Sequence, residues 1–182
     1  EAVSQNHGMG WVLRWIVVVL LMYGANGASA DVTTLQRAEA AIEGQAVRRM
    51  VDLPDDWDRT FPGMSGTVDY RMSFDWHDRT DLLGVYVRRA CTNLAVYLNG
   101  ELIGTGGRLD PPVTRNCYQP FLFRLPRALL REGANDLRIR VVGFAAEQVS
   151  ARQRAAGLST IRIGPLAEVE PVYETLPGWN GN

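Results

Sequence analysis

Apolar and polar residues alternate in several short segments of the chain, and this alternation predicts β-strands. Strict alternation places apolar side chains on one face of a strand and polar side chains on the other. The clearest case is segment 136–142, in which Leu137, Ile139 and Val141 alternate with polar residues. Further strands are predicted at 67–74, 82–87, 121–125 and 158–165. Because turns containing Gly or Pro separate these segments, the pattern favours an antiparallel β-sandwich.

A tight turn at Asn99-Gly100 joins two more predicted strands, 94–98 and 101–104. Asn and Gly tolerate the positive φ angles of a type I′ turn, which is a common connection in β-hairpins. The only two cysteines of the chain, Cys91 and Cys117, bracket this hairpin. A disulfide between them would clip the hairpin to the loop that follows it, and is expected if the chain is exported.

Two segments depart from the strand pattern. Residues 31–50 are expected to form a short N-terminal helix, because apolar residues recur there at roughly helical spacing. These residues are Leu35, Ala38, Ala41, Ile42 and Val47. Residues 167–182 show no periodicity and are expected to form an irregular tail. The sandwich itself is expected to occupy residues 51–166.

Residues 1–30 contain a predicted export signal. An uncharged apolar run, 15–23, follows Arg14 and precedes Ala28-Ser29-Ala30. A basic flank, a short apolar core and small residues at the cleavage site are typical of a secretory signal peptide. A bilayer span takes about 20 residues, so we expect cleavage after Ala30, with an uncleaved membrane anchor as the alternative.

Composition narrows the range of partners and chemistries. The formal net charge is −1 at pH 7, which gives no electrostatic reason to expect nucleic acid as a partner. Outside the predicted leader His77 is the only histidine, and no cluster of Cys and His has ligand spacing, so neither a metal nor a cofactor is expected. The acidic pairs Asp55/Asp56 and Asp78/Asp81 could serve a glycosidase. They lie in predicted turns, where Asp commonly bonds the backbone, and no catalytic residue is expected.

Candidate ligand-binding residues lie near the two cysteines and in two further segments. A disulfide would gather arginines whose guanidinium groups can grip a carboxylate or phosphate, although solvated loop arginines are the alternative. Trp57 could stack on a sugar ring, or it could plug the edge of the sandwich. The candidates are Arg88, Arg89, Arg115, Asn116, Trp57, Arg152 and Arg154.

The order of these motifs resembles the galactose-binding-like jelly roll. This fold occurs as the sugar-binding domain of family 2 glycoside hydrolases, and the chain is also similar to the periplasmic sensor modules of bacterial membrane histidine kinases. The resemblance covers about residues 51–166. The matching segments are 53–57, 66–71, 96–103, 121–125, 129–139, 157–159 and 163–165.

The cysteine pair, with 114–117 and 150–159, is more similar to the sensor modules. That resemblance implies a noncatalytic extracytoplasmic ligand-sensing domain, the input module of a membrane receptor, in the periplasm or on the extracytoplasmic face of the inner membrane. The chain stops at Asn182 with no second membrane segment and no kinase motif, so we expect a fragment of a longer receptor. The alternatives are a carbohydrate-binding accessory domain of a glycoside hydrolase and a structural interaction module without a small ligand.

The predicted leader can be tested directly on the exported protein. Because Ala28-Ser29-Ala30 offers small residues at the cleavage positions, N-terminal sequencing should start at Asp31. Recovery of residues 11–23 in a membrane fraction would instead support the anchor.

Overall fold

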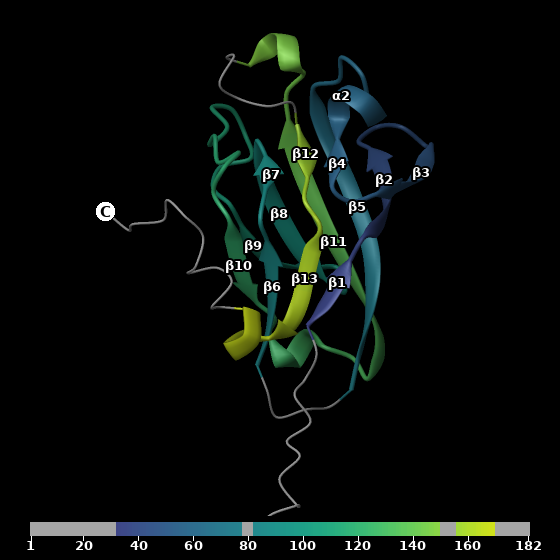
Figure 1. Cartoon of the computed structure of the whole chain (residues 1–182), viewed down its shortest axis with the longest axis vertical. Coiled ribbons are helices and arrows are strands. Elements are labelled where there is room, and N and C mark those ends of the chain that lie inside the picture. The colour runs from purple at the N-terminus through teal and green to yellow at the C-terminus, as the bar shows by residue number, and fades with distance from the viewer. Residues whose placement is uncertain (1–31, 78–81, 150–155, 170–182) are drawn as a thin grey trace, which may run out of the picture. The chain divides into compact units, whose positions relative to one another are not determined.

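The described part of the chain, residues 32–77, 82–149 and 156–169 of the computed structural model, forms an antiparallel β-sandwich (Figure 1). A four-stranded sheet has the order β1-β13-β6-β10, a six-stranded sheet the order β3-β2-β5-β11-β8-β9, and a three-stranded sheet the order β4-β12-β7. The all-β class predicted from the sequence is therefore confirmed. The elements are β1 Thr33–Leu35, β2 Arg37–Ile42, β3 Arg48–Asp52, β4 Asp55–Asp56, α2 Trp57–Thr60, β5 Gly66–Trp76, β6 Leu83–Val87, β7 Ala90–Cys91, β8 Asn93–Leu98, β9 Glu101–Thr105, β10 Phe121–Arg124, η1 Arg127–Leu129, β11 Gly133–Gly143, η2 Ala146–Gln148, β12 Gly157–Leu158 and β13 Ile161–Pro165.

The three-stranded sheet continues the four-stranded sheet past two short breaks. β6 ends at Val87 and β7 begins at Ala90, while β12 ends at Leu158 and β13 begins at Ile161. β12 pairs with β7 in the same antiparallel sense in which β13 pairs with β6. These two sheets together form one layer of the sandwich, and the six-stranded sheet forms the other (Figure 1).

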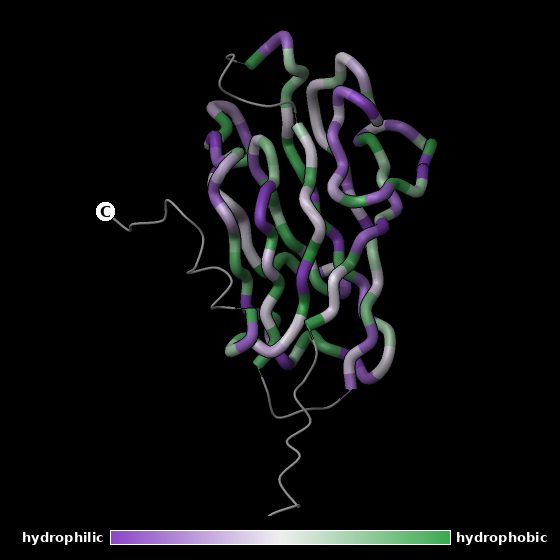
Figure 2. Tube along the Cα trace, in the orientation of Figure 1, coloured by the Kyte–Doolittle hydropathy of each residue, from purple (hydrophilic) through white to green (hydrophobic). Residues whose placement is uncertain are grey.

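The long strands β5 and β11 form the centre of the six-stranded sheet. They pair along their whole length, from Gly66 opposite Gly143 to Trp76 opposite Gly133. Hydrophobic and hydrophilic residues alternate along them (Figure 2). Burial of each apolar side chain contributes about 1.5–3 kcal/mol, so the alternation also stabilises the sandwich. The inward-facing side chains that are 0% exposed are Val68, Tyr70, Leu137, Ile139 and Val141.

The predicted Asn-Gly hairpin is confirmed between β8 and β9. Asn99 has a φ of 51° and Gly100 a φ of 96°, the two positive values that a type I′ turn requires. The Asn99 side chain also fixes the turn to the start of β11. Its Nδ2 donates to the Leu129 carbonyl at 2.7 Å and to Asn135 Oδ1 at 2.8 Å, and its Oδ1 accepts from the Asp136 N–H at 2.9 Å.

The helix predicted at residues 31–50 is wrong, because this segment forms strands β1 to β3. In β2, Ala38 and Ala40 are each 1% exposed, an alternation of period two. β2 pairs on one side with β3 and on the other with the central strand β5. Pairing with strands distant in sequence overrides the local helical spacing, and Gly44, with a φ of 78°, turns the chain between β2 and β3. The sandwich thus starts before the predicted boundary at residue 51.

The predicted tail begins as a packed helical turn and not as irregular chain. Residues 166–169 are helical, and Leu166 is 8% and Val169 0% exposed. The predicted leader, 1–30, and the segment 170–182 lie outside the described residues. Within the described ranges, no helix is long and apolar enough to cross a membrane.

The predicted disulfide between Cys91 and Cys117 is confirmed. Cys91 ends β7, and Cys117 lies between β9 and β10, so the bond ties this long connection to the three-stranded sheet. The cysteines are 26 positions apart. Closing a loop of that size stabilises the folded chain by about 3–4 kcal/mol on the chain-entropy model.

Replacing both cysteines with serine should therefore lower the free energy of unfolding by about 3–4 kcal/mol. Urea unfolding of the oxidised chain, the reduced chain and the Cys91→Ser, Cys117→Ser variant measures this difference. The reduced chain and the double variant should coincide. Equal stability of all three would show that the bond does not stabilise the fold.

Candidate functional site

The disulfide places the predicted arginine positions on adjacent segments. Arg88 and Arg89 directly precede β7, and Arg115 lies two positions before Cys117. Arg88 and Arg115 are exposed, Arg89 is half-buried, and none of the three side chains forms a hydrogen bond or ion pair with the described residues. The ligand-binding role of these arginines stays a prediction, and Arg152 and Arg154 lie outside the described residues.

Asn116 makes two hydrogen bonds that hold the long connection between β9 and β10 in place. Its backbone N–H donates to the Thr92 carbonyl at 2.9 Å, and its side-chain Nδ2 donates to the Gly106 carbonyl. The side chain therefore fixes the long connection between β9 and β10. One donor of its amide group is engaged in this way, whereas the three neighbouring arginines make no such contact with the described residues.

Trp57 is a core residue, and the prediction that it stacks on a sugar is wrong. It is 1% exposed, and its Nε1 donates to the Tyr70 hydroxyl at 2.7 Å. The Phe61 ring packs edge-on against it, with the ring centroids 6.2 Å apart. The alternative, in which Trp57 fills the edge of the sandwich, agrees with this burial.

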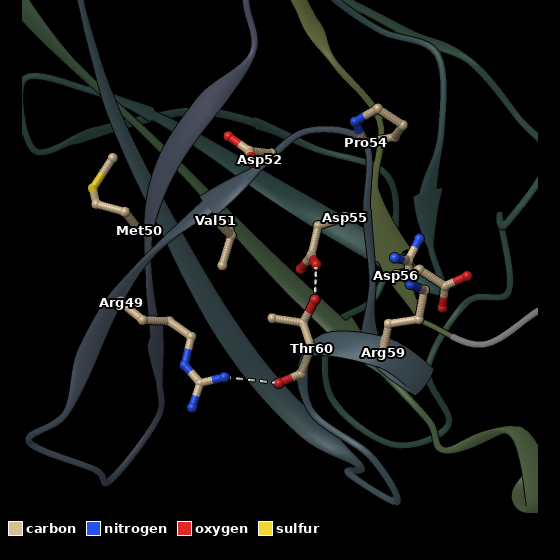
Figure 3. Close-up of a pocket in the computed structure, with 9 residues that line it drawn as sticks. All are labelled: Arg49, Met50, Val51, Asp52, Pro54, Asp55, Asp56, Arg59 and Thr60. Carbon is tan, nitrogen blue, oxygen red and sulfur yellow. Dashed lines mark hydrogen bonds between the residues drawn. The ribbon is translucent and has the colours of Figure 1, made fainter.

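A polar pocket lies between β3 and the segment formed by β4 and α2 (Figure 3). Its volume is about 420 Å³. Val51 and Asp55 are buried at its floor, whereas most of the rim is exposed. Two guanidinium groups and three carboxyl groups lie around this pocket. The lining residues are Arg49, Met50, Val51, Asp52, Pro54, Asp55, Asp56, Arg59 and Thr60.

A chain of hydrogen bonds connects the floor of the pocket to the core. The Trp57 N–H can only donate, so the Tyr70 oxygen accepts its hydrogen bond. The Tyr70 hydroxyl in turn donates a hydrogen bond to Asp55 Oδ2 at 2.6 Å. The Thr60 hydroxyl donates to Asp55 Oδ1. Burial and the neighbouring Asp55 charge raise the pKa of Tyr70 well above its usual range, so its hydroxyl stays protonated.

Sequence reasoning missed this pocket because Asp55 and Asp56 were assigned to a turn. Asp56 does cap α2, since its side chain accepts the Asp58 N–H at 3.2 Å. Asp55, in contrast, is 3% exposed. The available signal was the position of two carboxylates directly before Trp57, an apolar residue large enough to draw its neighbours into the core.

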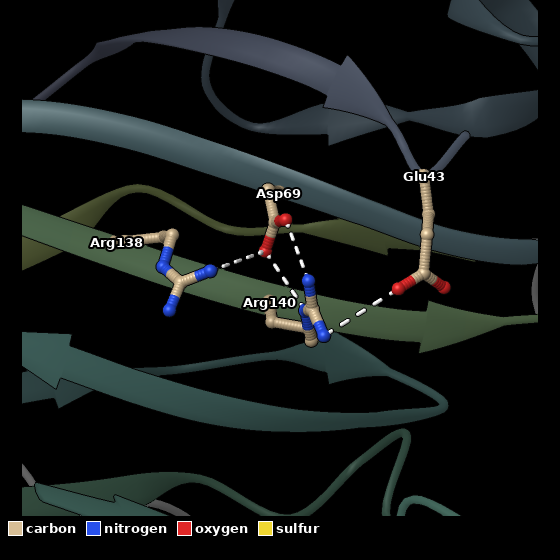
Figure 4. Close-up of polar contacts among 4 residues, drawn as sticks. All are labelled: Glu43, Asp69, Arg138 and Arg140. Atoms are coloured by element: carbon tan, nitrogen blue, oxygen red, sulfur yellow. Dashed lines mark hydrogen bonds and ion pairs between the residues drawn. The ribbon is translucent and has the colours of Figure 1, made fainter. Parts of the chain in front are cut away.

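A second polar cluster lies on the outer face of the six-stranded sheet (Figure 4). Arg140 donates to both oxygens of Asp69, at 3.0 and 2.9 Å, and lies 3.5 Å from Glu43. Arg138 lies 3.7 Å from Asp69, with its guanidinium carbon 3.9 Å from the centre of the Tyr97 ring. The hydrogen bonds to Asp69 raise the pKa of Arg140. These charges satisfy one another, so the cluster cross-links neighbouring strands and is a poor ligand site.

His77 contacts an acidic side chain at the surface, and the acidic pair Asp78/Asp81 lies outside the described residues. His77 Nδ1 lies 2.8 Å from Glu132 Oε1, and the two side chains are 68% and 64% exposed. Within 32–77, 82–149 and 156–169, no group of three or more His, Cys, Asp or Glu side chains could hold a metal ion.

Replacing Tyr70 with Phe should destabilise the chain by about 2–6 kcal/mol. The Trp57 N–H and the Asp55 carboxyl would each lose a buried partner, at roughly 1–3 kcal/mol per group. Chemical denaturation measures the loss. Tyr97→Phe is the matched control, because the Tyr97 hydroxyl makes no hydrogen bond with the described residues and its ring contact with Arg138 would remain. Equal stability of Tyr70→Phe and wild type would contradict the role of this hydroxyl.

The same variant should change the pH dependence of stability. Because the pKa of Tyr70 is higher in the folded chain than its ordinary value of 10.0, the stabilisation is present below pH 10 and lost as pH rises above it. The free energy of unfolding should therefore fall more steeply above pH 10 in wild type than in Tyr70→Phe.

No protein-family model and no curated protein sequence matches the chain. Solved structures do match it. An FMN-binding β-glucuronidase from Facaelibacterium prausnitzii L2-6 has a TM-score of 0.58 and 21% identity, over 74% of this chain and 22% of that chain. A β-D-glucuronidase from Dictyoglomus thermophilum has a TM-score of 0.59 and 15% identity, over 75% and 28%. A family 2 β-galacturonidase from Eisenbergiella tayi, bound to galacturonate, has a TM-score of 0.56 and 15% identity, over 75% and 24%.

The chain thus spans about a quarter of the length of these enzymes. The likeness agrees with the resemblance to family 2 glycoside hydrolases, whereas the resemblance to sensor modules of histidine kinases stays a prediction without support here. At these identities the comparison shows the fold. The chain is an antiparallel β-sandwich whose fold is similar to one part of these family 2 glycoside hydrolases.

Proposed function

We propose that the chain is a noncatalytic carbohydrate-binding domain, of the kind that accompanies the catalytic part of family 2 glycoside hydrolases. The observation that carries this proposal is the fold match over about three quarters of the chain. The match takes in only about a quarter of each enzyme, which fits an accessory domain better than a catalytic one. The disulfide fits an exported protein, so we include a periplasmic location in the proposal.

The proposed ligand is a saccharide that carries a carboxylate. The similar structures are named as glucuronidases and galacturonidases, enzymes of uronic sugars. In this chain, Arg88, Arg89 and Arg115 lie near the disulfide without a partner among the described residues. Guanidinium groups are always charged and offer paired donors that match a carboxylate. Segments at the end of a rigid sheet are also where binding residues usually lie.

Titration of the full chain with galacturonate and glucuronate tests the proposal. Both should raise the melting temperature of wild type, and the Arg89→Ala, Arg115→Ala double variant should lose this rise. Arg115 is exposed and Arg89 half-buried, and neither side chain has a hydrogen bond or ion pair with the described residues, so the melting temperature without ligand should stay nearly the same. Arg71→Ala is the matched control, because Arg71 is exposed on β5 and makes no hydrogen bond or ion pair with any described residue.

Three other results of this titration would contradict part or all of the proposal. A large drop in the stability of the unliganded double variant would show that the arginines are structural. Unchanged uronate binding by the double variant would place the site elsewhere. Absence of binding by wild type would contradict the proposed function itself.

A further inference from the structure

The pocket between β3 and α2 contains a buried carboxyl group with unused acceptor capacity (Figure 3). Asp55 is 3% exposed, and its two oxygens accept one hydrogen bond each, from Thr60 and Tyr70. An ionised carboxylate can accept about four hydrogen bonds. Buried charges are normally paired with a cation or a metal, yet none of the ion pairs between described residues includes Asp55. A hydrogen-bond donor from the pocket would complete its shell.

The rim of the pocket restricts the kind of donor. Asp52 is paired with Arg37 at 3.0 Å. The guanidinium groups of Arg49 and Arg59 thus balance the charges of Asp55 and Asp56 and leave no net charge that favours a cationic ligand. Arg49 is already engaged, because its Nη1 donates to the Thr60 carbonyl at 3.0 Å and its guanidinium carbon lies 5.3 Å from the Phe61 ring centre. Arg59 is exposed and makes no hydrogen bond or ion pair with the described residues. A suitable ligand therefore donates to carboxylates and also accepts from a guanidinium.

Neutral polyols meet both requirements, since every hydroxyl group donates and accepts. The remaining rim fits the apolar C–H surface of a sugar ring, because Met50 is 67% exposed and Pro54 is also exposed. The volume of about 420 Å³ lies within the range of small-molecule sites, roughly 300–1,000 Å³.

We propose that this pocket binds a neutral sugar ring. Asp55 and Asp56 accept hydrogen bonds from its hydroxyl groups, and Arg59 donates a hydrogen bond to a hydroxyl or ring oxygen. The choice of a sugar as the ligand rests on the proposed function, but this pocket is a different site from the one formed by the arginines near the disulfide. The pocket would give the domain affinity for the uncharged residues of a saccharide.

The pocket and the disulfide arginines are built on the same small sheet. Asp56 on β4 lies opposite Gly157 on β12, and Gly157 lies opposite Cys91 on β7. Paired strands are about 4.8 Å apart, so Asp56 and Cys91 are separated by about 10 Å. The two candidate sites thus lie beside the two edge strands of this sheet, β4 and β7.

Titration of the full chain with two probes separates the sites. One probe is a set of neutral methyl glycosides of glucose, galactose, mannose and xylose, and the other is galacturonate. The variants are Arg59→Ala and Asp56→Asn, the latter because Asn keeps the cap of α2. The controls are Arg71→Ala and the Arg89→Ala, Arg115→Ala double variant.

We expect at least one neutral glycoside to bind wild type. Its affinity should fall at least about tenfold in Arg59→Ala and in Asp56→Asn. The two controls should bind that glycoside like wild type, while galacturonate binding should be lost only in the double variant. Calorimetry on the four variants measures both affinities.

Three results would overturn the inference. If galacturonate binds wild type and no neutral glycoside does, or if the glycoside binds both pocket variants with wild-type affinity, the pocket is not the sugar site and the proposed function stands. If neither probe binds wild type, the proposed function fails and this inference fails with it.

Discussion

The hydrogen bond from Tyr70 to Asp55 is the interaction on which the part of the fold with the two candidate sites depends. Tyr70 lies on the central strand β5, and Asp55 lies on the two-residue strand β4, which is too short to be held by its own ladder. β4 pairs with β12, β12 pairs with β7, and β7 ends at the disulfide. One buried hydroxyl thus connects the core of the sandwich to the small sheet that carries both candidate sites.

The local alternation of apolar and polar residues was enough to predict strands whose pairing partners show the same alternation. Residues 136–142 alternate strictly and form part of β11, and Asn99-Gly100 forms the predicted turn. The helix prediction for segment 31–50 was wrong because alanine can be accommodated in either a helix or a tightly packed strand. Ala40 lies opposite Tyr70 of β5, far along the sequence, and Ala38 lies opposite Val51 of β3; both alanines are buried by this pairing. No local spacing contains that information.

The candidate site was predictable only in part, for the same reason. The disulfide followed from two cysteines that bracket a hairpin, and it does place Arg88, Arg89 and Arg115 on adjacent segments. The pocket did not follow, because it forms where β3 and α2 meet, and because the interaction of Asp55 with Tyr70 crosses the sandwich edge. Trp57 also shows that an aromatic residue near a predicted turn can serve the core instead of a sugar.

We propose that the three-stranded sheet carries a saccharide-binding surface. A titration of the isotopically labelled full chain with galacturonate, followed residue by residue in NMR spectra, tests this proposal. We expect saturable shifts in the backbone amides of β7, β12 and the residues next to Cys117. Shifts confined to the outer face of the six-stranded sheet, around Arg138 and Arg140, or no saturable shift at all, would contradict it.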